Sequence, residues 1–165
     1  MRLAAVEDVA QTLTRHGVRF MVVGGLAVAA HGYLRFTADV DMVIQLDSEN
    51  VLSAFKALAE AGYKPSVPVT GEQFAERALR DRWVAEKGMV VLSFWSDQYR
   101  DTPLDVFVSE PFDFDSEYNE GLQQELIPGV LLRFPKLETL IRMKLAAGRP
   151  KDLIDVEYLR KAQSA

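Results

Sequence analysis

The segment from Gly24 to Ile44 constrains the fold of this 165-residue chain more than any other stretch. An apolar run, Phe20 to Val23, ends in a pair of glycines, an alanine-rich segment follows, and Asp39-Val40-Asp41 then leads into a second apolar run. This order predicts a strand, a glycine turn, a short helix and an acidic strand. Because side chains alternate between the two faces of a strand, Asp39 and Asp41 are predicted to share one face.

Two carboxylates on one face of a strand need compensation. At about 4 Å, two like unit charges repel by roughly 4 kcal/mol at the effective dielectric near a protein surface. A shared proton or full solvation would offset this repulsion, and a divalent metal is the simplest answer. The glycine pair, Gly24-Gly25, allows a sharp turn and a close approach to a ligand, and the start of the following helix suits phosphate. The segment therefore predicts a metal site beside an anion site.

Two further charged residues stand in apolar surroundings. Asp105 lies inside the predicted strand from Pro103 to Val108, where an aspartate is disfavoured unless something compensates it. It belongs either to the solvated face of an edge strand or to a functional site, and its same-face neighbour Phe107 favours the second interpretation. Lys144 lies on or beside the apolar stripe of a predicted helix, so its ammonium group must reach solvent or meet an anion.

These patterns resemble those of a known family. An apolar strand, Gly-Gly or Gly-Ser, about a dozen residues and then Asp-x-Asp is similar to the signature of the polymerase-beta-type nucleotidyltransferase superfamily. The residues from Arg35 to Asp41 are most similar to small bacterial members, among them antibiotic nucleotidyltransferases and abortive-infection toxins. The segment from Lys144 to Asp155 resembles their C-terminal Lys…Arg-x-x-Asp pattern. Gly25 stands where the Gly-Ser members have a hydroxyl group.

The resemblance implies Mg²⁺-dependent transfer of a nucleotidyl group from a nucleoside triphosphate to an acceptor hydroxyl or phosphate. It implies three catalytic, metal-binding carboxylates, Asp39, Asp41 and Asp105, which converge only if the strand of Asp105 is next to that of the Asp-x-Asp pair. It implies three nucleotide-binding residues, Gly24, Gly25 and Lys144. For Asp152 and Asp155 we expect helix capping and a salt bridge to Arg149 rather than catalysis.

The acceptor is open at this stage: a small molecule such as an aminoglycoside or lincosamide, a tRNA end and a protein hydroxyl all fit. The alternative to an enzyme is a nucleotidyltransferase-fold binding protein or a toxin–antitoxin component with little turnover. The absence of a separate acceptor-binding domain from the sequence favours that alternative. Formation of a nucleotide-dependent product would separate the two hypotheses.

Length and composition limit the class of protein. The 165 residues suit a single domain, residues 1–165, with a real core. No apolar run approaches the roughly 18 residues of a membrane span, the N-terminus becomes acidic before a signal peptide could form, and there is no cysteine, so we expect a cytoplasmic protein. The net charge of −5 and the pI near 5.1 argue against an extended nucleic-acid surface, although one nucleotide can still be bound.

The pattern of the whole chain predicts an α/β (α+β) fold of the nucleotidyltransferase type, with a mixed, mostly antiparallel sheet flanked by helices and with helices at the C-terminus. Thr70 to Gln73 reads as a capping box that starts a short helix ending near Leu79. A hairpin is predicted from the segments 83–85 and 89–95, separated by Glu86-Lys87-Gly88. The sheet is expected to grow by the addition of antiparallel strands.

Overall fold

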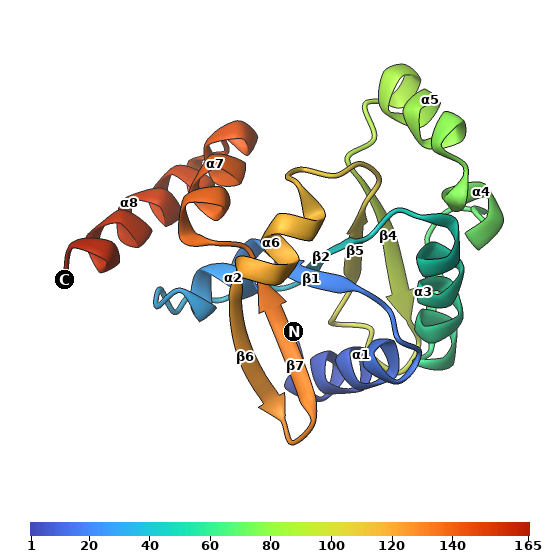
Figure 1. Cartoon of the computed structure of the whole chain (residues 1–165), viewed down its shortest axis with the longest axis horizontal. Helices are drawn as coiled ribbons and strands as arrows, with labels where there is room; N and C mark the ends of the chain where they lie inside the picture. Colours follow the sequence, from blue (N-terminus) through green and yellow to red (C-terminus); the bar gives the residue numbers. More distant parts are fainter.

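The strand that leads into the glycine pair forms one edge of a five-stranded sheet (Figure 1). The computed structural model describes residues 1–165. Only β2 and β5 run parallel to each other, and the other neighbours in the sheet are antiparallel. The five strands lie in the order β1 (Phe20–Val23), β2 (Val40–Ile44), β5 (Leu104–Phe107), β4 (Val91–Ser96) and β3 (Tyr63–Pro65).

One face of this sheet is apolar and holds the main core. Val22, Met42, Val106 and Leu92 occupy matching register positions on four strands, and all are buried. Two helices with apolar stripes pack over this face, α1 (Leu3–Arg15) and α3 (Ser48–Glu60). Asp47 caps α3 by accepting a hydrogen bond from the backbone N–H of Asn50.

The opposite face of the sheet is only partly covered, and this leaves room for a site. Next to β1 and β2 it is closed by a small apolar cluster of Met21, Val23, Val43 and Phe114. Further across the sheet it carries polar residues. Phe114 of this cluster belongs to α6 (Phe114–Glu120), and residues of the C-terminal helices α7 (Leu137–Ala147) and α8 (Pro150–Ser164) line the site. In contrast, α2 (Gly24–Ala30) and the hairpin of β6 (Leu122–Ile127) and β7 (Val130–Phe134) contribute residues to the main core.

The mixed, mostly antiparallel sheet with C-terminal helices confirms the predicted fold class. The predicted capping box is present at Thr70, where α4 (Gly71–Ala75) begins. The predicted hairpin is wrong, because segment 83–85 belongs to α5 (Arg77–Lys87), which Gly88 ends with a left-handed φ of 60°. Helix-favouring Arg, Ala, Glu and Lys residues dominate this segment, and they outweigh the short apolar pattern around Trp83.

Two strands, β3 and β6, were not predicted. Pro65 is the last residue of β3, at the edge of the sheet, where its missing N–H does no harm. The expectation of antiparallel additions fails at one place, between β2 and β5. None of the helices is both long and apolar enough to cross a bilayer.

Candidate active site

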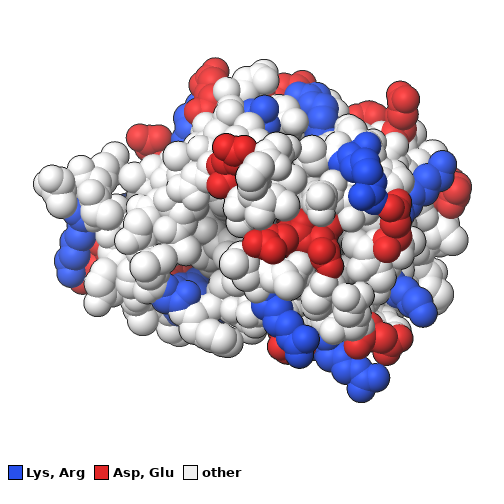
Figure 2. Space-filling view, turned by 90° about the horizontal axis from the view of Figure 1, so that it is seen from below, with Lys and Arg blue, Asp and Glu red and all other residues white.

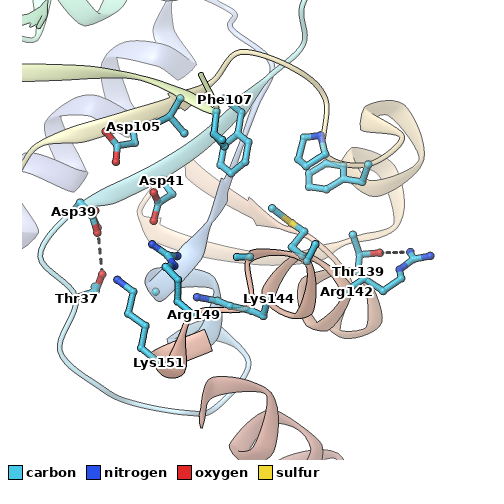
Figure 3. A pocket seen from close by; sticks show the side chains of 18 of the residues that line it. Thr37, Asp39, Asp41, Asp105, Phe107, Thr139, Arg142, Lys144, Arg149 and Lys151 are labelled. Atoms are coloured by element: carbon cyan, nitrogen blue, oxygen red, sulfur yellow. Dashed lines mark hydrogen bonds between the residues drawn. The ribbon is translucent and has the colours of Figure 1, made fainter. Parts of the chain in front are cut away.

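Three carboxylates meet on the partly open face of the sheet (Figure 3). The register places Asp41 of β2 directly beside Asp105 of β5, so the two strands are neighbours, as the sequence argument required. Asp39 lies two residues before Asp41 and points to the same side. Oxygen atoms of the three carboxylates lie within 4.8 Å of one another.

The protein supplies no counterion in direct contact with this cluster: none of the three carboxylates forms an ion pair. Burial and, after it, the neighbouring charges of Asp39 and Asp105 together raise the pKa of Asp41 to about 6, although Lys144 and Arg149 act in the opposite direction. Mg²⁺ and other hard divalent cations prefer sites where several oxygen ligands lie close together, as they do here. The cluster can therefore hold such a cation.

Two hydroxyl groups fix the positions of the acidic residues. The Oγ of Ser93 on β4 donates a hydrogen bond to Oδ1 of Asp105 at 2.6 Å. The Oγ1 of Thr37 donates to the backbone carbonyl oxygen of Asp39 at 3.3 Å. Sequence reasoning missed both residues, although Ser93 is a polar residue among the apolar ones of its strand and Thr37 lies within the motif that carries the resemblance.

The two glycines are required by close packing around these residues. Gly24 has a left-handed φ of 65°, and a Cβ atom there would lie 2.0 Å from Oδ2 of Asp41. A Cβ atom on Gly25 would lie 2.5 Å from the Oγ1 of Thr37. The hydroxyl of Thr37 thus occupies the space that a side chain at position 25 would take, and Gly25 itself lines the cleft.

Lys144 meets anions from its own chain. Its Nζ lies 3.0 Å from Oδ1 of Asp152 and 2.9 Å from Oδ2 of Asp155, and its side chain is only 7% exposed. Arg149 also pairs with Asp152, as the sequence predicted. Asp155 pairs instead with Arg35, which donates hydrogen bonds to its carboxylate from Nε at 2.6 Å and from Nη2 at 2.7 Å. This network joins α7, α8 and the loop that precedes β2.

The two aspartates of this network stay ionised although they are buried. Burial alone would raise the pKa of each, but hydrogen bonds from Arg149 and Lys144 lower the pKa of Asp152 below its ordinary value. Hydrogen bonds from Arg35 and Lys144 do the same for Asp155. Both residues therefore hold cations in place beside the carboxylate cluster.

A cleft of about 1420 Å³ opens over the carboxylates. One part of its wall is cationic, with Lys144, Arg149 and Lys151, and another part is apolar, with Phe107 and Met143 among its residues. In the view of Figure 3, Asp41 lies between Phe107 and Arg149. The volume exceeds the roughly 300–1,000 Å³ usual for a single small ligand, so the cleft has room for two.

Comparisons with known proteins establish the fold and the family of the chain. No curated protein matches the chain in sequence. Among the solved structures that share its fold are two of ANT(2'')-Ia. One is a solution structure of this antibiotic-resistance factor, with a TM-score of 0.59, 15% identity and coverage of 98% of this chain and 82% of that one. The other is a crystal structure in complex with adenylyl-2''-tobramycin, with a TM-score of 0.61, 14% identity and coverage of 99% and 89%.

At these identities the two neighbours establish the fold alone. The family is established by a model of its sequences, which matches residues 1–160 of this chain. It follows that the chain belongs to the family described as nucleotidyltransferase of unknown function, DUF6036.

Proposed function

We propose that the protein transfers a nucleotidyl group from a nucleoside triphosphate to an acceptor hydroxyl, with Mg²⁺ held by Asp39, Asp41 and Asp105. The observation that carries this proposal is the convergence of three carboxylates from two neighbouring strands, within 4.8 Å, without a cation from the protein in contact. Such a cluster is costly unless a ligand compensates it.

The residues fit the metal on chemical grounds. Every donor is a carboxylate oxygen, and the ionised form of Asp41 is disfavoured until a cation arrives, as its raised pKa indicates. When bound, magnesium would orient the α-phosphate and offset the charge that develops on the attacking and leaving oxygens.

Asp105 is the residue we propose as general base. The oxygen of the acceptor hydroxyl forms a bond to the α-phosphorus, the bond from that phosphorus to the bridging oxygen breaks, and pyrophosphate leaves. The proton of the hydroxyl passes to Asp105. Ser93 holds Oδ1 of this carboxylate at 2.6 Å, which leaves Oδ2 as the oxygen available for the proton.

The cationic wall is the proposed place of the polyphosphate. Gly24 and Gly25 bring the backbone close to the carboxylates there, and Lys144 adds its positive charge. Because Lys144 is shared by two aspartates, we infer that Arg149 and Lys151, whose side chains are exposed in the cleft, carry more of the contact with phosphate.

The structural neighbours support an adenylyl group as the first candidate for transfer. ANT(2'')-Ia was crystallised with adenylyl-2''-tobramycin, in which an adenylyl group is attached to tobramycin. We therefore propose ATP as the first donor to test, followed by the other nucleoside triphosphates.

The test uses ATP labelled with ³²P at either the α- or the γ-phosphate, Mg²⁺ and a cell extract as the source of acceptor. We expect a labelled product from α-labelled ATP only, and its loss in Asp105→Asn. Asp81→Asn, an exposed residue of α5, is the matched control and should behave as the parent. Label from γ-labelled ATP in the product would indicate phosphoryl transfer instead. Nucleotide binding without any product would favour the binding protein with little turnover.

A further inference from the structure

The part of the cleft next to Asp105 is apolar. Phe107 follows Asp105 by two residues and shares its face of β5, and Val91 of β4 lies directly opposite Phe107. Phe107, Phe112 and Met143 all pack against the same small cluster under α6 and α7, so they form a continuous wall. An acceptor whose hydroxyl reaches Asp105 must contact this wall.

Two acidic residues line this part of the cleft, and one of them is fully engaged. Glu117 is buried, and its Oε1 accepts a hydrogen bond from Oγ1 of Thr139 at 2.6 Å while Oε2 accepts from the backbone N–H of Lys136 at 2.8 Å. Asp113 caps α6 by accepting from the backbone N–H of Ser116 at 2.9 Å. The carboxylate of Glu117 is therefore not free to bind a cationic ligand, whereas Asp113 is exposed and keeps its second oxygen free.

A cation is available instead. Arg142 of α7 lines the cleft, is exposed and forms no ion pair, and its one side-chain hydrogen bond goes from Nη2 to Oγ1 of Thr139 at 3.1 Å. Figure 3 shows Arg142 and Thr139 together at one end of the cleft. Lys136, also in the lining, is paired with Glu120 at 2.8 Å. Arg142 is therefore the cation at this end of the cleft that has no acidic partner.

We propose that the acceptor is a small hydroxyl compound with a flat apolar or aromatic body and a negatively charged group. This inference rests on the proposed function and names the substrate class for it. The apolar body would lie on Phe107, Phe112 and Met143, and the negative group would pair with Arg142. The acceptor O–P bond forms as the bond to pyrophosphate breaks, with the hydroxyl proton passing to Asp105.

Two other classes of acceptor fit this surface less well. A polycation would meet Arg142 and, apart from the three carboxylates at the metal site, would find only Asp113 to pair with. A long polyanion such as RNA needs a continuous basic surface, whereas the chain carries a net charge of −5 and Figure 2 shows acidic and basic side chains interspersed on the face it displays.

The experiment compares acceptor analogues that share one body and differ in charge. Binding of 4-hydroxyphenylacetate and of tyramine is measured by ligand-observed NMR in the presence of Mg²⁺ and α,β-methylene ATP, with tobramycin and a short oligoribonucleotide as further ligands. We expect the acid to bind roughly fivefold more tightly than the amine, as suits one partly exposed ion pair. Phe107→Ala should weaken the binding of the acid, and Phe107→Leu should weaken this binding less.

The charge of Arg142 is tested by Arg142→Glu, with Arg160→Glu on the exposed side of α8 as the control of equal charge change. Only the first variant should remove the preference for the acid. The proposal is overturned if tobramycin or the oligoribonucleotide binds more tightly than the acid, if none of the ligands binds, or if both variants act alike. Calorimetry of nucleotide binding on the same samples tests the proposed function separately, because the preference between acid and amine can also be measured without nucleotide.

Discussion

Replacing Asp41 by asparagine should stabilise the protein in metal-free buffer while removing its response to Mg²⁺. The side chain keeps its size but loses a charge that burial and two neighbouring carboxylates disfavour. The pKa of Asp41 rises from 3.8 to about 6 on folding. At 1.36 kcal/mol per pH unit, this difference corresponds to about 3 kcal/mol of unfolding free energy.

The sign of the pH dependence follows from the raised pKa. Between pH 3.8 and about 6 the folded protein holds a proton that the unfolded chain has released, so the contribution of Asp41 to stability falls as the pH rises through this window. Below pH 3.8 the charge has no effect, and above pH 6 its full cost is present. Asp41→Asn should therefore match the parent near pH 3.5 and exceed it by up to about 3 kcal/mol at pH 8.

The assay is urea unfolding in EDTA at pH 3.5 and pH 8, followed by the fluorescence of Trp83 and Trp95, and repeated at pH 8 with Mg²⁺. Asp81→Asn is the control for loss of an exposed carboxylate and should change little. Magnesium should stabilise the parent, by about 2.7 kcal/mol at a concentration of 100 Kd, and should stabilise Asp41→Asn much less. A variant no more stable than the parent at pH 8, or equally stabilised by Mg²⁺, would refute the reasoning.

Three further substitutions test other parts of the site. Gly24→Ala combines a left-handed φ with a Cβ atom inside the carboxylate of Asp41, so thermal unfolding should show a loss of about 2 kcal/mol or more; an unchanged Tm would contradict the packing described. Lys144→Met leaves two buried aspartates of α8 without their lysine and should cost about 3–5 kcal/mol of unfolding free energy in urea. The role in nucleotide binding implied by the sequence predicts instead a larger effect on triphosphate affinity than on stability. Calorimetry of triphosphate binding, measured beside urea unfolding, decides between the two expectations. Asp105→Asn should bind magnesium and nucleotide in calorimetry yet lower turnover by about two to four orders of magnitude; nearly normal turnover would remove it from the mechanism.

Local sequence patterns were enough to predict the part of the fold that carries the acidic pair. The run from Phe20 to Ile44 forms the predicted strand, glycine turn, helix and strand, because apolar alternation and glycine act over a few residues. An aspartate inside an apolar strand must be compensated, which singled out Asp105, but its place beside Asp41 was implied by the resemblance to nucleotidyltransferases. The parallel pairing of these strands was not foreseen, since register between distant strands leaves no local signal.

The errors lie where short patterns compete or where distant residues meet. Around Trp83 a few apolar residues suggested a strand, but most of the eleven residues of α5 have a high helix propensity. The partners of Lys144 could not be assigned from spacing alone, because Asp155 lies on the next helix and its second cation, Arg35, is 120 positions away. The hydrogen bond from Ser93 to Asp105 likewise depends on the register of β4 against β5.

The most direct test of the account is a crystal structure of the protein with Mn²⁺ and α,β-methylene ATP, in which manganese is located by its anomalous scattering. The account predicts one or two manganese ions bound by oxygens of Asp39, Asp41 and Asp105, about 3.5–4 Å apart if there are two, with the α-phosphate on the same ions and the polyphosphate toward Arg149. Manganese bound elsewhere, or a nucleotide whose phosphates lie away from the three carboxylates, would contradict it.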